Sequence, residues 1–208
     1  MYSSRITKTF LAITCLTIMF SACNSPTNHP PSNDPSRHAT DRAALIRELQ
    51  ALHTRIASND KKDIGKLFTF PVPDSLLSLY SADSAFDTEW QKDGVLSENV
   101  YNTRFDKISE EWQLTEFSKV FTALDITLLL HKDTLHHDAI VMTEPCYKTY
   151  SIEIDGDSVI TITYGSNRND KYKGKINAEE IYKCEFQAFW TFIFDGTRLR
   201  FVKQSAAG

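Results

Sequence analysis

The chain is poor in glycine and proline, with seven of each in 208 residues, and it lacks a long apolar run. Its longest uncharged and mostly apolar stretch, residues 10–20, is about half of what a membrane-spanning helix needs. Few glycines leave few places where the backbone can approach a phosphate closely. No phosphate-binding loop, dinucleotide fingerprint or nucleophile elbow is present. These absences argue against a permanent membrane helix and against the common nucleotide-binding and hydrolase motifs.

The N-terminus carries two basic residues within its first eight positions, then the apolar stretch, then Ser21-Ala22-Cys23. This order is typical of a secretory signal peptide, which is cleaved after small residues. It resembles the signal of bacterial lipoproteins, in which the cysteine is acylated and becomes the mature N-terminus, although Phe20 replaces the usual aliphatic residue. The resemblance implies a signal peptide over residues 1–22 and lipidation of Cys23, which anchors the protein to a membrane. The alternative is an ordinary signal peptide followed by a chance cysteine.

Residues 24–39 have the composition of a flexible linker. Four prolines lie among Ser, Asn and Asp residues, and no apolar residue recurs with a helix or strand period. We therefore expect Cys23 and the linker to tether a single domain over residues 40–208, a length that suits one core. Loss of two basic residues with the signal peptide moves the formal net charge from −4 to −6, which argues against a nucleic-acid partner. The expected location is the bacterial cell envelope, at the outer membrane facing the periplasm.

Two cysteines remain in the expected domain, Cys146 and Cys184. An oxidising periplasm permits a disulfide between them, and closing a loop of about 38 residues would stabilise the fold by roughly 4 kcal/mol. Cys146 shares the parity of Tyr150, and Cys184 shares that of Phe186, so both sulfurs point inward if these faces line one core. Two buried free thiols are the alternative.

Apolar residues at helical spacing dominate the first half of the domain. Thr40 is the expected N-cap of a first helix, which ends near residues 58–60. Asp60 can cap a second, short helix, and Ser97 can cap a longer helical region that is broken and then resumes toward Phe121. The apolar stripe of the first helix consists of Leu45, Leu49, Leu52 and Ile56.

Two further segments are harder to assign from their pattern. Residues 74–96 have no sustained period, and the apolar run 126–130 is ambiguous between a strand and a helix end.

From residue 147 the apolar period changes to two, which indicates strands. We expect four antiparallel strands, with turns at residues 155–157 and 195–196. The strongest signal is a strand with seven alternating apolar residues over 182–194, which predicts one fully buried face. The inward residues of the four strands are Tyr150, Ile152 and Ile154; Ile160, Ile162 and Tyr164; Tyr182, Cys184, Phe186, Ala188, Trp190, Phe192 and Phe194; and Leu199 and Phe201.

Helices followed by long antiparallel strands are an α+β order. The order and spacing of these elements, including residues 68–71, 189–192 and 199–202, resemble the nuclear-transport-factor-2-like (cystatin-like cone) superfamily over most of residues 40–208. The resemblance implies N-terminal helices packed on a curved antiparallel sheet. The superfamily includes isomerases, dehydratases, polyketide cyclases, protein-binding scaffolds and lipoproteins of unknown role, so the fold does not decide the function.

The inward face of the predicted sheet carries no Asp, Glu, His or Arg. General acid–base catalysis needs a titratable group held against the substrate, so we assign no catalytic residue inside the cone. The larger polar aromatic residues can line a groove for a ligand or simply fill the core. They are Tyr150, Tyr164, Tyr182 and Trp190.

The segment 131–138 gathers three histidines and two aspartates, which are metal-ligand types. Its spacing matches no helical ligand pair, and His136 and His137 would point to opposite faces of a strand. A polar connection between two elements explains the segment better, so we expect neither a metal site nor a cofactor. The basic loop 168–175 could meet an acidic partner but is typical of a solvated loop.

We expect a non-catalytic binding or interaction module of the cell envelope that binds a protein partner or an apolar or aromatic ligand. One alternative is a small cone-fold isomerase or hydrolase. Its reaction would use groups at the cone mouth, namely Asp125, His131, Glu144 or Tyr150. Another alternative is a dimeric envelope assembly factor, because Phe189 and Ile193 place two large apolar side chains on the outward parity of the longest strand.

Overall fold

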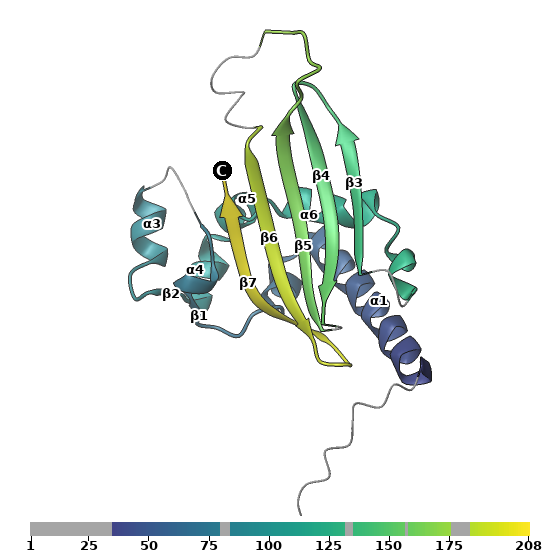
Figure 1. Cartoon of the computed structure of the whole chain (residues 1–208). Coiled ribbons are helices and arrows are strands. Elements are labelled where there is room, and N and C mark those ends of the chain that lie inside the picture. The colour runs from purple at the N-terminus through teal and green to yellow at the C-terminus, as the bar shows by residue number, and fades with distance from the viewer. Residues whose placement is uncertain (1–34, 80–83, 132–134, 157, 176–183) are drawn as a thin grey trace, which may run out of the picture. The chain divides into compact units, whose positions relative to one another are not determined.

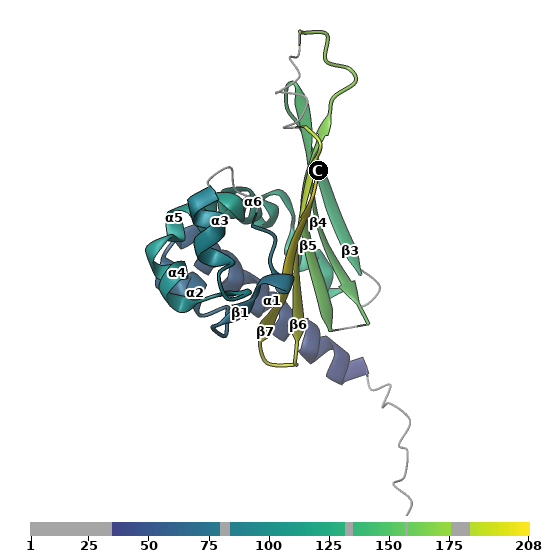
Figure 2. The ribbon, with the colours of Figure 1, turned by 90° about the vertical axis from the view of Figure 1, so that its left-hand side faces the viewer.

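Helices precede the main sheet in the chain and pack on one of its faces, as Figures 1 and 2 show. The computed structural model describes residues 35–79, 84–131, 135–156, 158–175 and 184–208, with side chains from Arg42 onward. The predicted signal peptide, Cys23, the linker up to residue 34, and Tyr182 lie outside the described residues. The α+β class predicted from the order of periods is confirmed.

The helical layer contains six α-helices within the described ranges, together with two 3₁₀-helices and a two-stranded ladder. The helices are α1 (Pro35–Ser58), α2 (Lys61–Gly65), α3 (Ser84–Trp90), α4 (Glu98–Thr103), α5 (Phe105–Glu111), α6 (Leu114–Ala123), η1 (Asp74–Leu76) and η2 (Ile126–Leu130). The short ladder pairs β1 (Val72–Pro73) with β2 (Val95–Leu96). Residues 74–96 therefore hold η1, α3 and β2, and the ambiguous run 126–130 is a 3₁₀-helix.

The first helix buries the predicted stripe, since Leu45, Leu49, Leu52 and Ile56 are all buried. It begins at Pro35, so the prediction that Thr40 is its N-cap is wrong, and the helix takes in the last residues of the predicted linker. Proline suits the first position of a helix because the amide hydrogen it lacks would have no partner there. A proline-containing segment therefore does not exclude a helix start.

Two predicted caps are confirmed. The carboxylate of Asp60 accepts hydrogen bonds from the backbone amides of Lys62 at 2.8 Å and Asp63 at 3.0 Å. The Ser97 hydroxyl accepts one from the amide of Val100 at 3.2 Å. The long helical region after Ser97 is broken as expected, and Gln113 between α5 and α6 has a left-handed φ of 51°.

The main sheet is antiparallel and open, with five strands in the order β3-β4-β5-β6-β7. Neighbouring strands are also neighbours in sequence, which makes the sheet a meander (Figure 1). The strands are β3 (His136–Met142), β4 (Cys146–Asp155), β5 (Val159–Arg168), β6 (Phe186–Phe194) and β7 (Leu199–Ala207). A register irregularity after Thr191 shifts the pairing of β6 with β7.

The first strand of the sheet corrects the sequence interpretation. Residues 136–138 are not a polar connection but the beginning of β3, where His136 pairs with Glu153 and Asp138 pairs with Ser151 of β4. These residues form a strand because their backbone pairs with β4, which is a long-range contact. Such pairing does not require a local alternation of apolar residues. The sheet therefore has five strands where the sequence predicted four.

The inner face of the sheet packs on the helical layer through large apolar side chains. Trp190 of β6 lies against Phe117 of α6, with ring centroids 4.7 Å apart, and against Trp112, 5.4 Å away. Ile162 pairs with Trp190 across the ladder and is also fully buried. No described helix combines the length and the apolar composition needed to cross a membrane.

Candidate functional site

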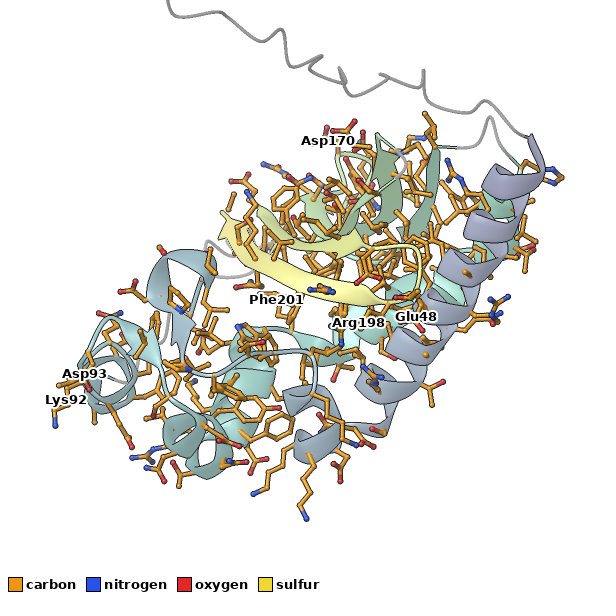
Figure 3. All side chains as sticks on the ribbon, turned by 90° about the horizontal axis from the view of Figure 1, so that it is seen from below. Glu48, Lys92, Asp93, Asp170, Arg198 and Phe201 are labelled. Atoms are coloured by element: carbon orange, nitrogen blue, oxygen red, sulfur yellow. A yellow bond between two sulfur atoms is a disulfide. The ribbon has the colours of Figure 1, made fainter. Side chains whose placement is uncertain are left out.

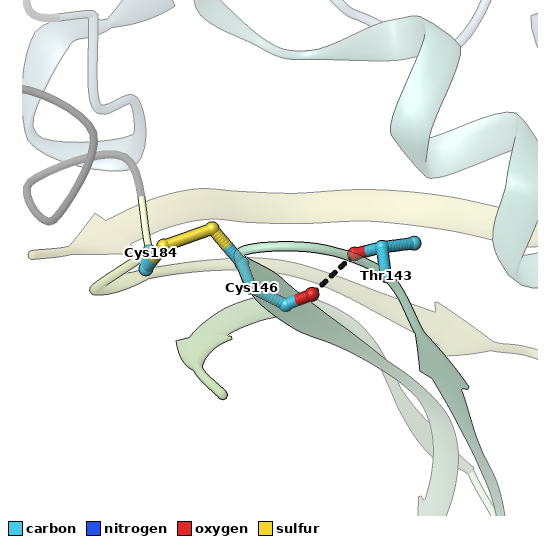
Figure 4. Close-up of a disulfide and its surroundings, with 3 residues drawn as sticks. All are labelled: Thr143, Cys146 and Cys184. Atoms are coloured by element: carbon cyan, nitrogen blue, oxygen red, sulfur yellow. Dashed lines mark hydrogen bonds between the residues drawn. A yellow bond between two sulfur atoms is a disulfide. The ribbon is translucent and has the colours of Figure 1, made fainter. Parts of the chain in front are cut away.

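Cys146 and Cys184, the two cysteines singled out in the sequence, are joined in a disulfide (Figure 4). Cys146 begins β4, and Cys184 lies just before β6, with their Cα atoms 5.3 Å apart. β5 separates these strands in the sheet, so the disulfide bridges across the end of β5. The Thr143 hydroxyl donates a hydrogen bond to the carbonyl oxygen of Cys146. The disulfide thus joins the start of β4 to the segment before β6, on either side of β5.

The aromatic residues considered for a groove are buried in the core. Tyr150 and Tyr164 pair across β4 and β5, and their rings stack at 5.7 Å. Trp190 lies deeper, with only 1% of its surface exposed. Tyr182 falls outside the described residues. The structure therefore brings Tyr150 and Tyr164 together and uses them, with Trp190, as core.

A polar cluster joins α6 to β4 around Glu116. Its carboxylate accepts hydrogen bonds from Lys148 at 2.8 Å, Lys119 at 2.9 Å and the Tyr150 hydroxyl at 3.1 Å. Burial works against the charged carboxylate, but the hydrogen bonds from Lys119 and Lys148 outweigh it, so the pKa of Glu116 is lowered. Burial, and then the charge of Glu116, raise the pKa of Tyr150.

This cluster is a poor acid–base centre. A general base works best when its pKa is close to the working pH, whereas Glu116 is held ionised by two ammonium groups and Tyr150 is held neutral. Such a set can fix α6 on the sheet, since hydrogen bonds to charged groups are stronger than neutral ones. We therefore assign it a structural role.

The four residues considered for an enzymatic cone mouth do not form a constellation. Asp125 caps η2, where it accepts hydrogen bonds from the hydroxyl of Thr127 at 2.6 Å and from its amide at 3.0 Å. Those bonds lower the pKa of Asp125. His131 and Glu144 are exposed. Within the described part of the chain, no hydrogen bond or ion pair joins any two of Asp125, His131, Glu144 and Tyr150.

A surface cleft beside β7 is the strongest candidate for a binding site. It has a volume of about 420 Å³ and lies between α1, the segment that follows α2, and the start of β7. Figure 3 shows Glu48, Arg198 and Phe201 gathered where β7 passes α1, far from Lys92 and Asp93. The floor and wall of the cleft are mainly Leu67, Phe68, Val72, Leu76, Leu199 and Phe201, and its charged residues are Glu48, Arg55, Lys66, Arg198 and Arg200.

The shape of the cleft is set by contacts between α1, β7 and the segment after α2. The Glu48 carboxylate of α1 accepts a hydrogen bond from the backbone amide of Leu199 at 3.2 Å. Phe68 meets Phe201 edge to face, with centroids 4.9 Å apart. These two contacts join segments that are more than 130 residues apart in the chain, and they leave an apolar floor under a charged rim.

The rim of the cleft carries more cations than acids. Arg198 and Arg200 share Asp195, at 3.7 and 2.8 Å. Hydrogen bonds from the Thr197 hydroxyl, and then from the amides of Arg198 and Thr197, lower the pKa of Asp195. Lys66 pairs with Asp63 at 2.6 Å.

Arg55 makes no salt bridge to any described residue. Counting Glu48 and the two acids at the edge, Asp63 and Asp195, four cations face three acids. The cleft is therefore locally positive in a chain of net charge −4.

The cleft was missed in the sequence because no local signal marks it. Arg55 lies in the last turn of α1, and Arg198 and Arg200 flank the beginning of β7. Each is separately typical of a solvated surface residue. Of the predicted inward residues, Leu199 and Phe201 line the cleft, and they signal only that β7 has an apolar face.

The histidines and acids of the described residues form no group of three or more that could hold a metal ion. His136 lies 3.4 Å from Asp138 on the exposed side of β3, and both side chains are open to solvent. His137 falls on the opposite face of the strand, as the alternation of a strand requires.

The chain matches no protein-family model, no curated protein and no solved structure.

Proposed function

We propose that this protein is a lipid-anchored binding module of the bacterial cell envelope that catalyses no reaction, built on a nuclear-transport-factor-2-like arrangement of helices and sheet. The observation that carries the proposal is the division between a filled interior and an open cleft. The inner face of the sheet is packed by helices, whereas the cleft beside β7 reaches the surface.

The filled interior argues for binding rather than catalysis. Trp112, Trp190 and Phe192 are fully buried. The inner-face positions of β4 to β6 hold mainly apolar or tyrosine side chains, and the polar exceptions Lys148 and Ser166 pair with each other at one end of the ladder, where Lys148 is bound to Glu116. The buried polar side chain of Gln204 is occupied, because it accepts a hydrogen bond from the amide of Ser78 at 2.7 Å. An enzyme of this architecture needs convergent titratable groups in a solvent-connected cavity.

The envelope location is supported by two independent features. The N-terminal order of basic, apolar and small residues before Cys23 is typical of exported lipoproteins. The Cys146–Cys184 disulfide suits an oxidising compartment, because cytosolic thiols are kept reduced. Lipid chains on Cys23 would hold the domain at a membrane through their buried CH₂ groups.

Metabolic labelling with an alkyne fatty acid in an exporting bacterial host tests the anchor. The wild-type chain should incorporate the label, and Cys23→Ser should lose it. Cys15→Ser is the matched control, because it removes the same side chain from the apolar stretch and should leave labelling intact. An unlabelled wild-type chain, or a labelled Cys23→Ser variant, would reject lipidation at this residue.

A further inference from the structure

We propose that the cleft beside β7 binds a small ligand that carries a carboxylate, phosphate or sulfonate group on an apolar or aromatic body. This inference rests on the proposed binding function and names the chemistry of its ligand. It follows from three properties of the cleft, which are its floor, its rim and its size.

The floor offers a surface for an apolar body. Phe68 and Phe201 meet edge to face at 4.9 Å, and the cleft wall continues through Val72 and Leu199. Leu199 and Phe201 are only partly buried and can contact a further ring, whereas Phe68 and Val72 are buried behind them. An apolar ligand part would remove both itself and this floor from water, which is favourable in proportion to the apolar area covered.

The rim offers partners for an oxoanion. Arg55 and Arg198 carry guanidinium groups, which match the two oxygens of a carboxylate or phosphate in a bidentate geometry. Arg55 has no salt bridge within the described ranges, and the Arg198 pair with Asp195 is long, at 3.7 Å, with Arg198 65% exposed. Arg200 is bound more closely to Asp195, at 2.8 Å. Arg55 and Arg198 are therefore the rim cations that a ligand can engage at least cost.

The acid in the cleft does not favour a cationic ligand. Glu48 is already engaged, because its carboxylate accepts the hydrogen bond from the amide of Leu199. Its negative charge repels an anionic ligand. Glu48 thus lowers the affinity for an anion while it positions β7, and the charge of the rim still exceeds it.

The size of the cleft limits the ligand to a small molecule. Its volume of about 420 Å³ lies at the lower end of the range of roughly 300–1,000 Å³ that small-molecule sites occupy. Phenyl phosphate combines one ring with one anion and is a suitable probe. Inorganic phosphate and phenol each keep one half of its chemistry.

Isothermal titration calorimetry on the full chain in phosphatidylcholine nanodiscs tests the proposal. We expect saturable binding of one phenyl phosphate per chain, with much weaker binding of inorganic phosphate and of phenol. Arg55→Ala and Arg198→Ala should each weaken binding about tenfold, as expected for loss of a charged hydrogen bond. Arg47→Ala, on the exposed side of the same helix and outside the cleft, is the matched control and should bind normally.

Glu48→Gln provides a variant whose effect has the opposite sign. It keeps an oxygen that can accept the Leu199 hydrogen bond and removes the negative charge, so phenyl phosphate should bind a few-fold more tightly. Replacing part of the neutral lipid by phosphatidylglycerol separates two sources of the anion. If phosphatidylglycerol weakens phenyl phosphate binding, the site takes an anionic lipid headgroup. If the affinity for phenyl phosphate is unchanged, the site takes a free anionic ligand.

The proposal would be overturned if phenyl phosphate showed no saturable binding. It would also be overturned if the Arg55→Ala and Arg198→Ala variants bound phenyl phosphate as tightly as the wild-type chain. Equal affinity for phenol would reject the anionic part of the ligand, and equal affinity for inorganic phosphate would reject the apolar part. These failures leave the lipid anchor untouched, because the anchor is judged by fatty-acid labelling of Cys23.

Discussion

The two faces of the main sheet are made by the same strands but differ in burial. On the inner face, Ile162 and Trp190 are cross-strand partners and are fully buried under the helices. One residue along, Thr161 and Thr191 are partners on the outer face, which no described helix covers (Figure 2). The inner face therefore holds the fold together, and the cleft proposed as the ligand site lies outside it, beside β7.

The outer face is not uniformly polar. It carries several threonine and serine side chains, but Phe189 lies between Thr163 and Ser205, and Ile193 is 42% exposed. Substitutions that alter one face at a time test whether the two faces contribute differently to stability.

The largest effect is expected from Trp190→Ala on the inner face. Truncation of a buried tryptophan that packs on Phe117 and Trp112 should lower the free energy of unfolding by about 3–5 kcal/mol. Thr191→Ala, the next residue on the opposite face, should change it by less than about 0.5 kcal/mol. Urea unfolding followed by tryptophan fluorescence and circular dichroism measures both values. Similar losses in the two variants would contradict the division between the faces.

The disulfide should contribute the next largest effect, because it fixes one end of the sheet. The double variant Cys146→Ala/Cys184→Ala should unfold about 2–4 kcal/mol more easily than the wild-type chain. Reducing agent should destabilise the wild-type chain by a similar amount and should leave the double variant unchanged. Two free thiols in a titration of unfolded, unreduced wild-type protein would rule the bond out.

Glu116 should make stability depend on pH. Its pKa is lowered in the folded state, so the cluster contributes fully above the ordinary carboxyl pKa of 4.5 and is lost as the pH falls through the lowered value. Glu116→Gln should therefore cost about 1–2 kcal/mol at pH 7 and should flatten the acid side of the stability profile. The control is Glu153→Gln, an exposed position on the outer face. An equal flattening by Glu153→Gln would argue against the lowered pKa.

The smallest effect on stability is expected on the outer face. Phe189→Thr with Ile193→Thr should change the free energy of unfolding by less than about 1 kcal/mol, since both side chains already meet solvent. Sedimentation of the wild-type and variant chains should give the same mass. A wild-type dimer that the substitutions dissociate would favour the assembly-factor alternative and would make the outer face an interface.

The sequence predicted elements well where the cause is local. Alternation over residues 186–194 assigns each side chain of β6 to a face, because the strand period is two. Asp60 and Ser97 are caps because their side-chain oxygens reach amides two or three residues ahead. β3 was missed for the complementary reason, since His136 and Asp138 owe their strand conformation to β4.

The candidate site was less accessible from the sequence than the fold. Tyr150, Tyr164 and Trp190 were correctly placed on the inner face, but composition alone could not distinguish a groove from a core. The helices that fill the space decide it, through contacts such as that of Phe117 on Trp190. The cleft depends on the fold bringing Arg55 and Arg198 to the lining of one cavity, which no spacing in the chain reports.

The amino-acid sequence by itself determined the order of helices and strands, the face on which each residue of β4 to β6 lies, and the pair of cysteines able to meet. These follow from short-range periodicity, capping and parity, which act within a few residues. Only the tertiary structure decided the fifth strand, the early start of α1 and the positive cleft beside β7. Those features arise where segments distant in the chain come into contact. The contacts that stabilise them form only between segments, so no segment shows them by itself.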